Sequence, residues 1–103
     1  MPKIHSQAAV QIGTRMRTAR QAFGISLEDL GELANINWTT IGKIERGASS
    51  PTAETLVRIA SALEVDPALF ITGVTSDMYG PTTHQLTARD LIDERARKAN
   101  ERQ

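Results

Sequence analysis

Two short blocks of helical periodicity, separated by only three residues, constrain this sequence more than any other feature. Between residues 26 and 46, apolar residues recur at helical spacing on either side of Asn35-Ile36-Asn37, which predicts two short helices joined by a turn. Asn35 tolerates the positive φ that a reversal needs. Asn37 can cap the following helix by accepting from its first amides. Because Gly31 in the first block is small, the second helix can cross it closely.

The flanking segments are also predicted to be helical. Over residues 8–23 apolar residues again recur at helical spacing, and Gly24 suits the left-handed position after such a helix. Ser26 then serves as the next N-cap, with Asp29 as the acidic partner of an imperfect capping box. Two later helices, one capped by Thr52 and a brief one ended by Gly73, are expected to bury Leu56, Ile59, Ala60, Leu63, Leu69 and Phe70.

The chain divides into four parts on this pattern, and its predicted fold class is all-α. Residues 1–7 are interpreted as a flexible arm, and residues 8–73 as one domain of five helices. Residues 74–85 show no period and are interpreted as a linker. Residues 86–103 form a C-terminal helix with Thr87 as N-cap, whose thin apolar strip leaves its role open.

Composition excludes several classes of protein. The chain has no cysteine and two histidines, so disulfides, cysteine-based zinc sites and thiol nucleophiles are excluded. Neither histidine stands at a recognisable spacing from a nucleophile, and no Gly-rich phosphate loop or metal-ligand pattern occurs. We therefore expect no enzyme activity, cofactor, metal or small-molecule ligand. With no long apolar run and no signal-peptide core, we expect a cytoplasmic protein without a membrane contact.

The charge of the chain is balanced overall but unevenly distributed. The formal net charge is zero, which by itself gives no support for a polyanionic partner. Residues 1–47 nevertheless hold six basic and four acidic side chains, whereas residues 48–85 hold one basic and four acidic side chains. The half of the chain that contains the two linked helices is thus the more basic one.

The stretch SLEDLGELANINWTTIGKIERG resembles the Cro/repressor-like helix-turn-helix family, which includes lambdoid phage repressors and many small bacterial regulators. The resemblance runs from about Ile12 to Gly73, through IERG, the loop at Pro51, LVRIASALEV and LFITG. It implies a five-helix domain that binds double-stranded DNA by placing its third helix in the major groove.

Family roles carry over to individual positions. Arg20 and Glu45 match a structural ion pair between the first and third helices. The matching base contacts are Trp38, Thr39, Thr40, Gly42 and Lys43, and the matching phosphate contacts are Ser26, Arg46, Ser49, Ser50 and Thr52. Two departures reduce the base-contacting set: many members carry Gln where this chain has Leu27, and Gly42 has no side chain.

The resemblance implies a transcriptional regulator, most simply a repressor that occludes a promoter as in phage or mobile-element immunity. One alternative is an antitoxin or other protein-interaction module whose tail, residues 74–103, holds a partner. The fifth helix suggests a homodimer through Leu69 or Phe70, formed in solution or only on DNA, although Phe70 can instead close the core. Lys3 and His5 are interpreted as a disordered end, with an arm that touches DNA as the alternative.

Overall fold

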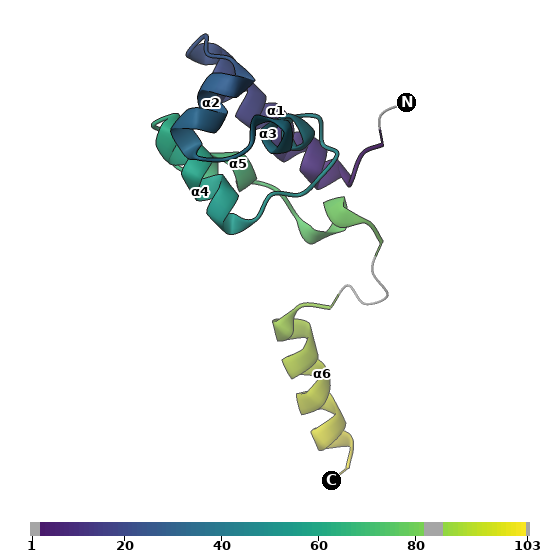
Figure 1. Ribbon diagram of the computed structural model, residues 1–103. Helices are drawn as coiled ribbons and strands as arrows, with labels where there is room; N and C mark the ends of the chain where they lie inside the picture. Colours follow the sequence, from purple (N-terminus) through teal and green to yellow (C-terminus); the bar gives the residue numbers. More distant parts are fainter. Residues whose placement is uncertain (1–2, 82–85, 103) are drawn as a thin grey trace.

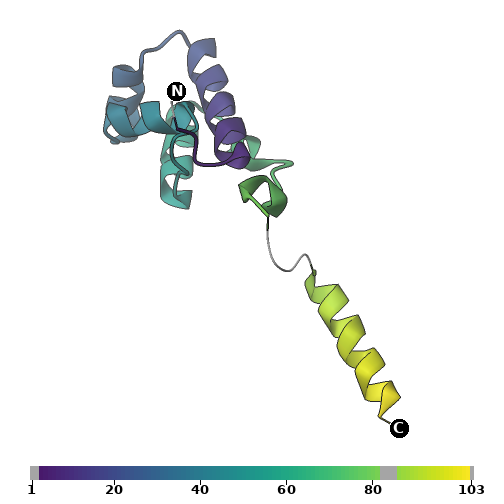
Figure 2. The same cartoon turned by 90° about the vertical axis from the view of Figure 1, so that its right-hand side faces the viewer.

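The computed structural model describes residues 3–81 and 86–102, and every regular element in these residues is helical (Figure 1). Figures 1 and 2 show the first five α-helices gathered into one bundle and the last standing apart from it. The elements are α1 (Gln7–Ala22), α2 (Leu27–Ala34), α3 (Trp38–Glu45), α4 (Ala53–Ala62), α5 (Ala68–Ile71), the 3₁₀ helix η1 (Ser76–Tyr79) and α6 (Ala88–Glu101).

Side-chain caps define the helix boundaries as the sequence predicts. Ser26 and Asp29 form a complete reciprocal capping box at the start of α2. Asn35 takes the left-handed conformation with φ 57°, and the Asn37 side chain accepts from the Thr39 amide at 2.9 Å. Thr52 likewise caps α4. The turn between α2 and α3 is therefore fixed by local chemistry on both sides.

The core lies between α1 and helices α2 to α5. Its largest fully buried side chains are Ile12, Met16, Leu30, Ile41, Ile44, Ile59, Leu63 and Phe70. Ile41 and Ile44 place the inner face of α3 in this core, which leaves the opposite face of that helix toward solvent. Leu56 packs against the core only partly.

The prediction that Leu69 and Phe70 both face inward is wrong for Leu69. Phe70 is fully buried, whereas Leu69 is 54% exposed. Successive residues on a helix point about 100° apart, and on this short helix the direction that buries Phe70 leaves Leu69 at the surface. Phe70 thus closes the core of the monomer and is not available as a dimer contact, while Leu69 remains on the surface.

The segment predicted as a linker is partly ordered. Residues 76–79 form η1, which lies against α1, and Val74 packs on the core. Residues 82–85 of this segment, His84 among them, lie outside the described residues. Beyond it, Thr87 and Asp90 cap α6 as predicted. No residue of α6 is buried, so this helix contributes nothing to the hydrophobic core.

Candidate nucleic-acid interface

A largely buried ion pair fixes the end of α3 to α1, as the family resemblance implies. The Arg20 Nε donates to Glu45 Oε2 at 2.8 Å and its Nη2 donates to Glu45 Oε1 at 3.0 Å. The two side chains are only 12% and 5% exposed. The hydrogen bonds from Arg20 to Glu45 raise the pKa of the guanidinium further above its usual range. A third bond, from Nη1 to the Ile25 carbonyl, extends the clamp to the start of α2.

Two glycines let backbones approach α3 closely. A Cβ at Gly13 would lie 2.1 Å from the Ile44 carbonyl oxygen, and a Cβ at Gly31 would lie 2.7 Å from the Ile36 carbonyl oxygen. Neither obstacle is a side chain that can rotate away. The role of Gly31 follows from the sequence prediction, whereas Gly13 was missed; its signal is a glycine inside a helical pattern, where alanine would be the more stable residue.

The outer face of α3 carries a short polar and basic stripe. Thr39, Lys43 and Arg46 stand at positions i, i+4 and i+7, which share one side of a helix, and all three are exposed. Trp38 at the start of α3 is 47% exposed, and Thr40 is exposed at the edge of the stripe. Four of the five predicted base-contacting residues therefore lie together on the accessible part of α3.

Gly42 departs from this arrangement, because it is buried rather than exposed. A Cβ at Gly42 would lie 3.1 Å from Arg46 Nη1 and 3.7 Å from Leu27 Cδ1. The Arg46 side chain thus runs back along α3 and covers the glycine. The sequence places Gly42 among the base contacts, but this position offers neither a side chain nor an open surface.

The predicted phosphate contacts lie at the start of α2 and around the loop that precedes α4. Ser26 and Thr52 cap these helices and remain exposed, Ser50 is exposed and Ser49 is half-buried. The first amides of a helix and its dipole both favour a negative group.

The amino-terminal segment is tied to the end of α3 rather than flexible along its whole length. The His5 amide donates to the Gly47 carbonyl at 2.7 Å, and Ser6 caps α1. This anchoring contradicts the interpretation of residues 1–7 as a flexible arm for the part that the structure describes, in which Gln7 already begins α1. The segment lines a surface depression together with the basic side chains of α3; its residues are Lys3, Ile4, His5, Lys43, Arg46 and Ala48.

Arg15 is a structural residue that joins α1 to α5. Its Nη1 donates to the carbonyls of Leu69, Phe70 and Thr72, at 3.3, 3.2 and 2.6 Å. These carbonyls belong to the end of α5, where unpaired acceptors favour a cation. Arg15 thus holds α5 on α1, and a depression beside it exposes Leu69.

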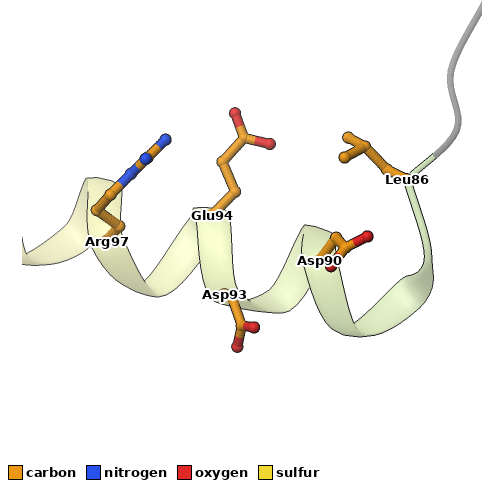
Figure 3. Close-up of a pocket in the computed structure, with 5 residues that line it drawn as sticks. All are labelled: Leu86, Asp90, Asp93, Glu94 and Arg97. Carbon is orange, nitrogen blue, oxygen red and sulfur yellow. The ribbon is translucent and has the colours of Figure 1, made fainter.

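A further surface hollow lies along α6. The depression along α6 is lined by the side chains drawn in Figure 3, where Leu86, Glu94 and Arg97 lie on one side of the helix and Asp93 points away. In residues 3–81 and 86–102, no cluster of three or more histidine or acidic side chains could hold a metal ion. None of the helices in this part of the chain is long and apolar enough to cross a membrane.

A clamped short helix with an exposed outer face, preceded by a capped helix and a tight turn, defines a helix-turn-helix domain. The family model described as Helix-turn-helix, HTH_3, matches residues 16–70. The chain belongs to this Cro/C1-type helix-turn-helix family.

Two curated relatives are similar over a longer stretch than the family model covers. The HTH-type transcriptional regulator SutR of Escherichia coli strain K12 is 34% identical over 84 residues, covering 79% of this chain and 47% of that protein. The HTH-type transcriptional regulator DdrOP3 of Deinococcus deserti is 32% identical over 79 residues, covering 77% of this chain and 60% of the relative. The chain thus spans about half the length of the curated relatives it matches.

Solved structures extend the likeness. The restriction-modification controller protein C.AhdI from Aeromonas hydrophila superposes with a TM-score of 0.59 and 31% identity, covering 60% of this chain and 94% of that one. The DNA-binding domain of the P22 c2 repressor superposes with a TM-score of 0.57 and 23% identity, covering 75% and 92% of the two chains. At this identity, the similarity to the P22 c2 repressor domain shows a shared fold alone.

Proposed function

We propose that this chain is a transcriptional regulator that binds a specific site in double-stranded DNA through α3. The observation that carries the proposal is the exposed stripe of Thr39, Lys43 and Arg46 on a helix whose inner face and end are held by the core and by Arg20. A helix held in this way can enter the major groove without a costly change of shape. The regulators and the controller protein named above support the proposal.

The base contacts proposed for α3 follow from the chemistry of its exposed side chains. Lys43 can donate to the O6 and N7 acceptors of guanine, and a Thr39 or Thr40 methyl can contact the methyl of thymine. Trp38 offers an exposed apolar surface beside these residues for a sugar or a thymine methyl. Phosphate contacts are proposed for the helix starts at Ser26 and Thr52 and for the loop at Ser49 and Ser50.

Repression by occupancy of a promoter is the simplest mode of action for such a domain. A two-fold dimer would place the two α3 helices in successive major grooves, with half-sites about 34 Å apart. Leu69 and Ile71, which are 54% and 46% exposed on α5, are the proposed apolar dimer contacts. Phage immunity and control of a restriction-modification system both fit this mode.

The proposal is tested by enriching the full chain against randomised duplex DNA at near-physiological salt. We expect a symmetric motif, and we expect Lys43→Ala to weaken binding to that motif by about 1–3 kcal/mol and to relax one base position. Arg58→Ala, on the outer face of α4 and paired there with Glu54, is the control that should leave both unchanged. Enrichment of no motif would refute the proposed function.

A further inference from the structure

We infer that Arg46 is a base-contacting residue of this interface and that Gly42 determines its position. The inference rests on the proposed function, and it revises the phosphate role that the family resemblance implies for Arg46. It is carried by one local feature, the guanidinium that lies over the glycine on the outer side of α3. Gly42 has no side chain of its own. The side chain of Arg46 reaches back along α3 and lies beside this position instead.

The position of Arg46 on the helix supports this assignment. Thr39, Lys43 and Arg46 share the outer side of α3, and helical side chains point back toward the N-terminus. Arg46 ends α3 as its C-cap, yet its Nη1 lies one turn earlier, 3.1 Å from where a Cβ of Gly42 would be. The charged group therefore lies toward the part of α3 that a major groove accepts most deeply.

The surroundings leave the guanidinium available to a ligand. Among the residues that the structure describes, no carboxylate forms an ion pair with Arg46, and its side chain remains exposed. Leu27, whose Cδ1 lies on the same side of Gly42, offers neither donor nor acceptor to hold it. The planar fork of arginine fits the O6 and N7 acceptors of guanine with two parallel hydrogen bonds.

Gly42 creates the space for this placement. An alanine there would put its Cβ 3.1 Å from Nη1, closer than ordinary contact, so the guanidinium would have to shift by a few tenths of an ångström. The obstacle is the far end of a flexible side chain, and alanine favours a helix over glycine. Gly42→Ala should therefore leave the fold intact and change only where the charge lies.

The test compares the wild-type chain with Arg46→Ala, Arg46→Lys and Gly42→Ala, using enrichment from randomised duplex DNA followed by titration of all single-base-pair variants of the selected site. We expect Arg46→Ala to bind the selected site about 5- to 150-fold more weakly and to lose preference at one base pair of each half-site. Arg46→Lys keeps the charge but not the fork, and should lose much of the same preference. Arg58→Ala is the matched arginine control.

Gly42→Ala tests the position of the Arg46 guanidinium without removing its charge. We expect this variant to lose base preference at the same base pair. Its salt dependence should be retained because no charge is removed, and its thermal midpoint should be retained because the fold stays intact. Arg46 would be assigned to a phosphate contact if Arg46→Ala lost affinity equally for all sequences and Arg46→Lys kept the full base preference. That result would overturn this inference and leave the proposed function standing. Wild-type preference in Gly42→Ala would overturn the positioning role of the glycine. A wild-type chain that selects no motif would overturn the proposed function itself.

Discussion

Removing the arginine of the buried pair should destabilise the domain more than any other single-charge deletion. Arg20→Ala eliminates both bonds to Glu45 and the bond to the Ile25 carbonyl. It leaves the carboxylate of Glu45, whose side chain is 5% exposed, without its partner. Breaking a buried pair from one side costs about 3–5 kcal/mol, because a charge stays in a poorly solvated place. For a domain of this size, that corresponds to a thermal midpoint lowered by about 12–40 °C.

Urea and thermal unfolding followed by far-UV circular dichroism measure this effect directly. Arg17→Ala is the matched control, since Arg17 lies on the same helix but is exposed, and its midpoint should stay within a few degrees of the wild type. A second variant, Arg20→Met with Glu45→Leu, removes both charges and should recover most of the lost stability. A double-mutant cycle that compares this double variant with Arg20→Met and Glu45→Leu alone gives the coupling energy between the two side chains.

Two results would refute this reasoning. An unchanged midpoint in Arg20→Ala would mean that the pair contributes nothing, as exposed pairs often do. A double variant no more stable than Arg20→Ala would mean that the cost arises from lost packing of the arginine stem rather than from the stranded carboxylate. Either result would remove the ion pair as the reason why α3 holds its position.

Three further changes test other contacts. Gly13→Ala should destabilise the fold by about 1–3 kcal/mol in urea unfolding, despite the better helix propensity of alanine, because its Cβ meets a carbonyl of α3; a stabilised variant would contradict the close approach. Arg15→Ala should cost about 1–3 kcal/mol in the same assay through the carbonyls of α5, and equality with Arg17→Ala would show that these bonds add no stability. Lys3→Ala should lower the salt slope of DNA binding by about one unit, whereas an unchanged slope would remove the amino-terminal segment from the interface.

Local signals predicted most of the fold. The caps at Ser26, Asn37 and Thr52 and the left-handed Asn35 depend on residues adjacent in sequence, so the turn between α2 and α3 could be predicted from the chain alone. The pair of Arg20 with Glu45 depended instead on the family resemblance, since neither periodicity nor spacing links residues so far apart.

The interpretations that failed depended on contacts between distant segments. Nothing in the local sequence indicates that the Arg15 guanidinium meets the end of α5, or that the His5 amide meets Gly47. Gly42 shows a subtler limit. Periodicity places it on the outer face of α3, but Arg46 and Leu27 lie against it, and periodicity does not describe such contacts.

A main-chain contact at Gly13 acts together with the packing of Ile41 and Ile44 in fixing the distance between α1 and α3. A carbonyl pressed against Gly13 cannot move aside by changing rotamer, as a side chain could, so the helix position tolerates little change at this point. The outer stripe makes no contact of that kind. Substitutions on the stripe should therefore alter DNA preference at nearly constant stability, whereas changes at Gly13 or Arg20 should lower stability and binding together. This separation gives the chain a fixed frame on which the DNA preference can be changed without rebuilding the fold.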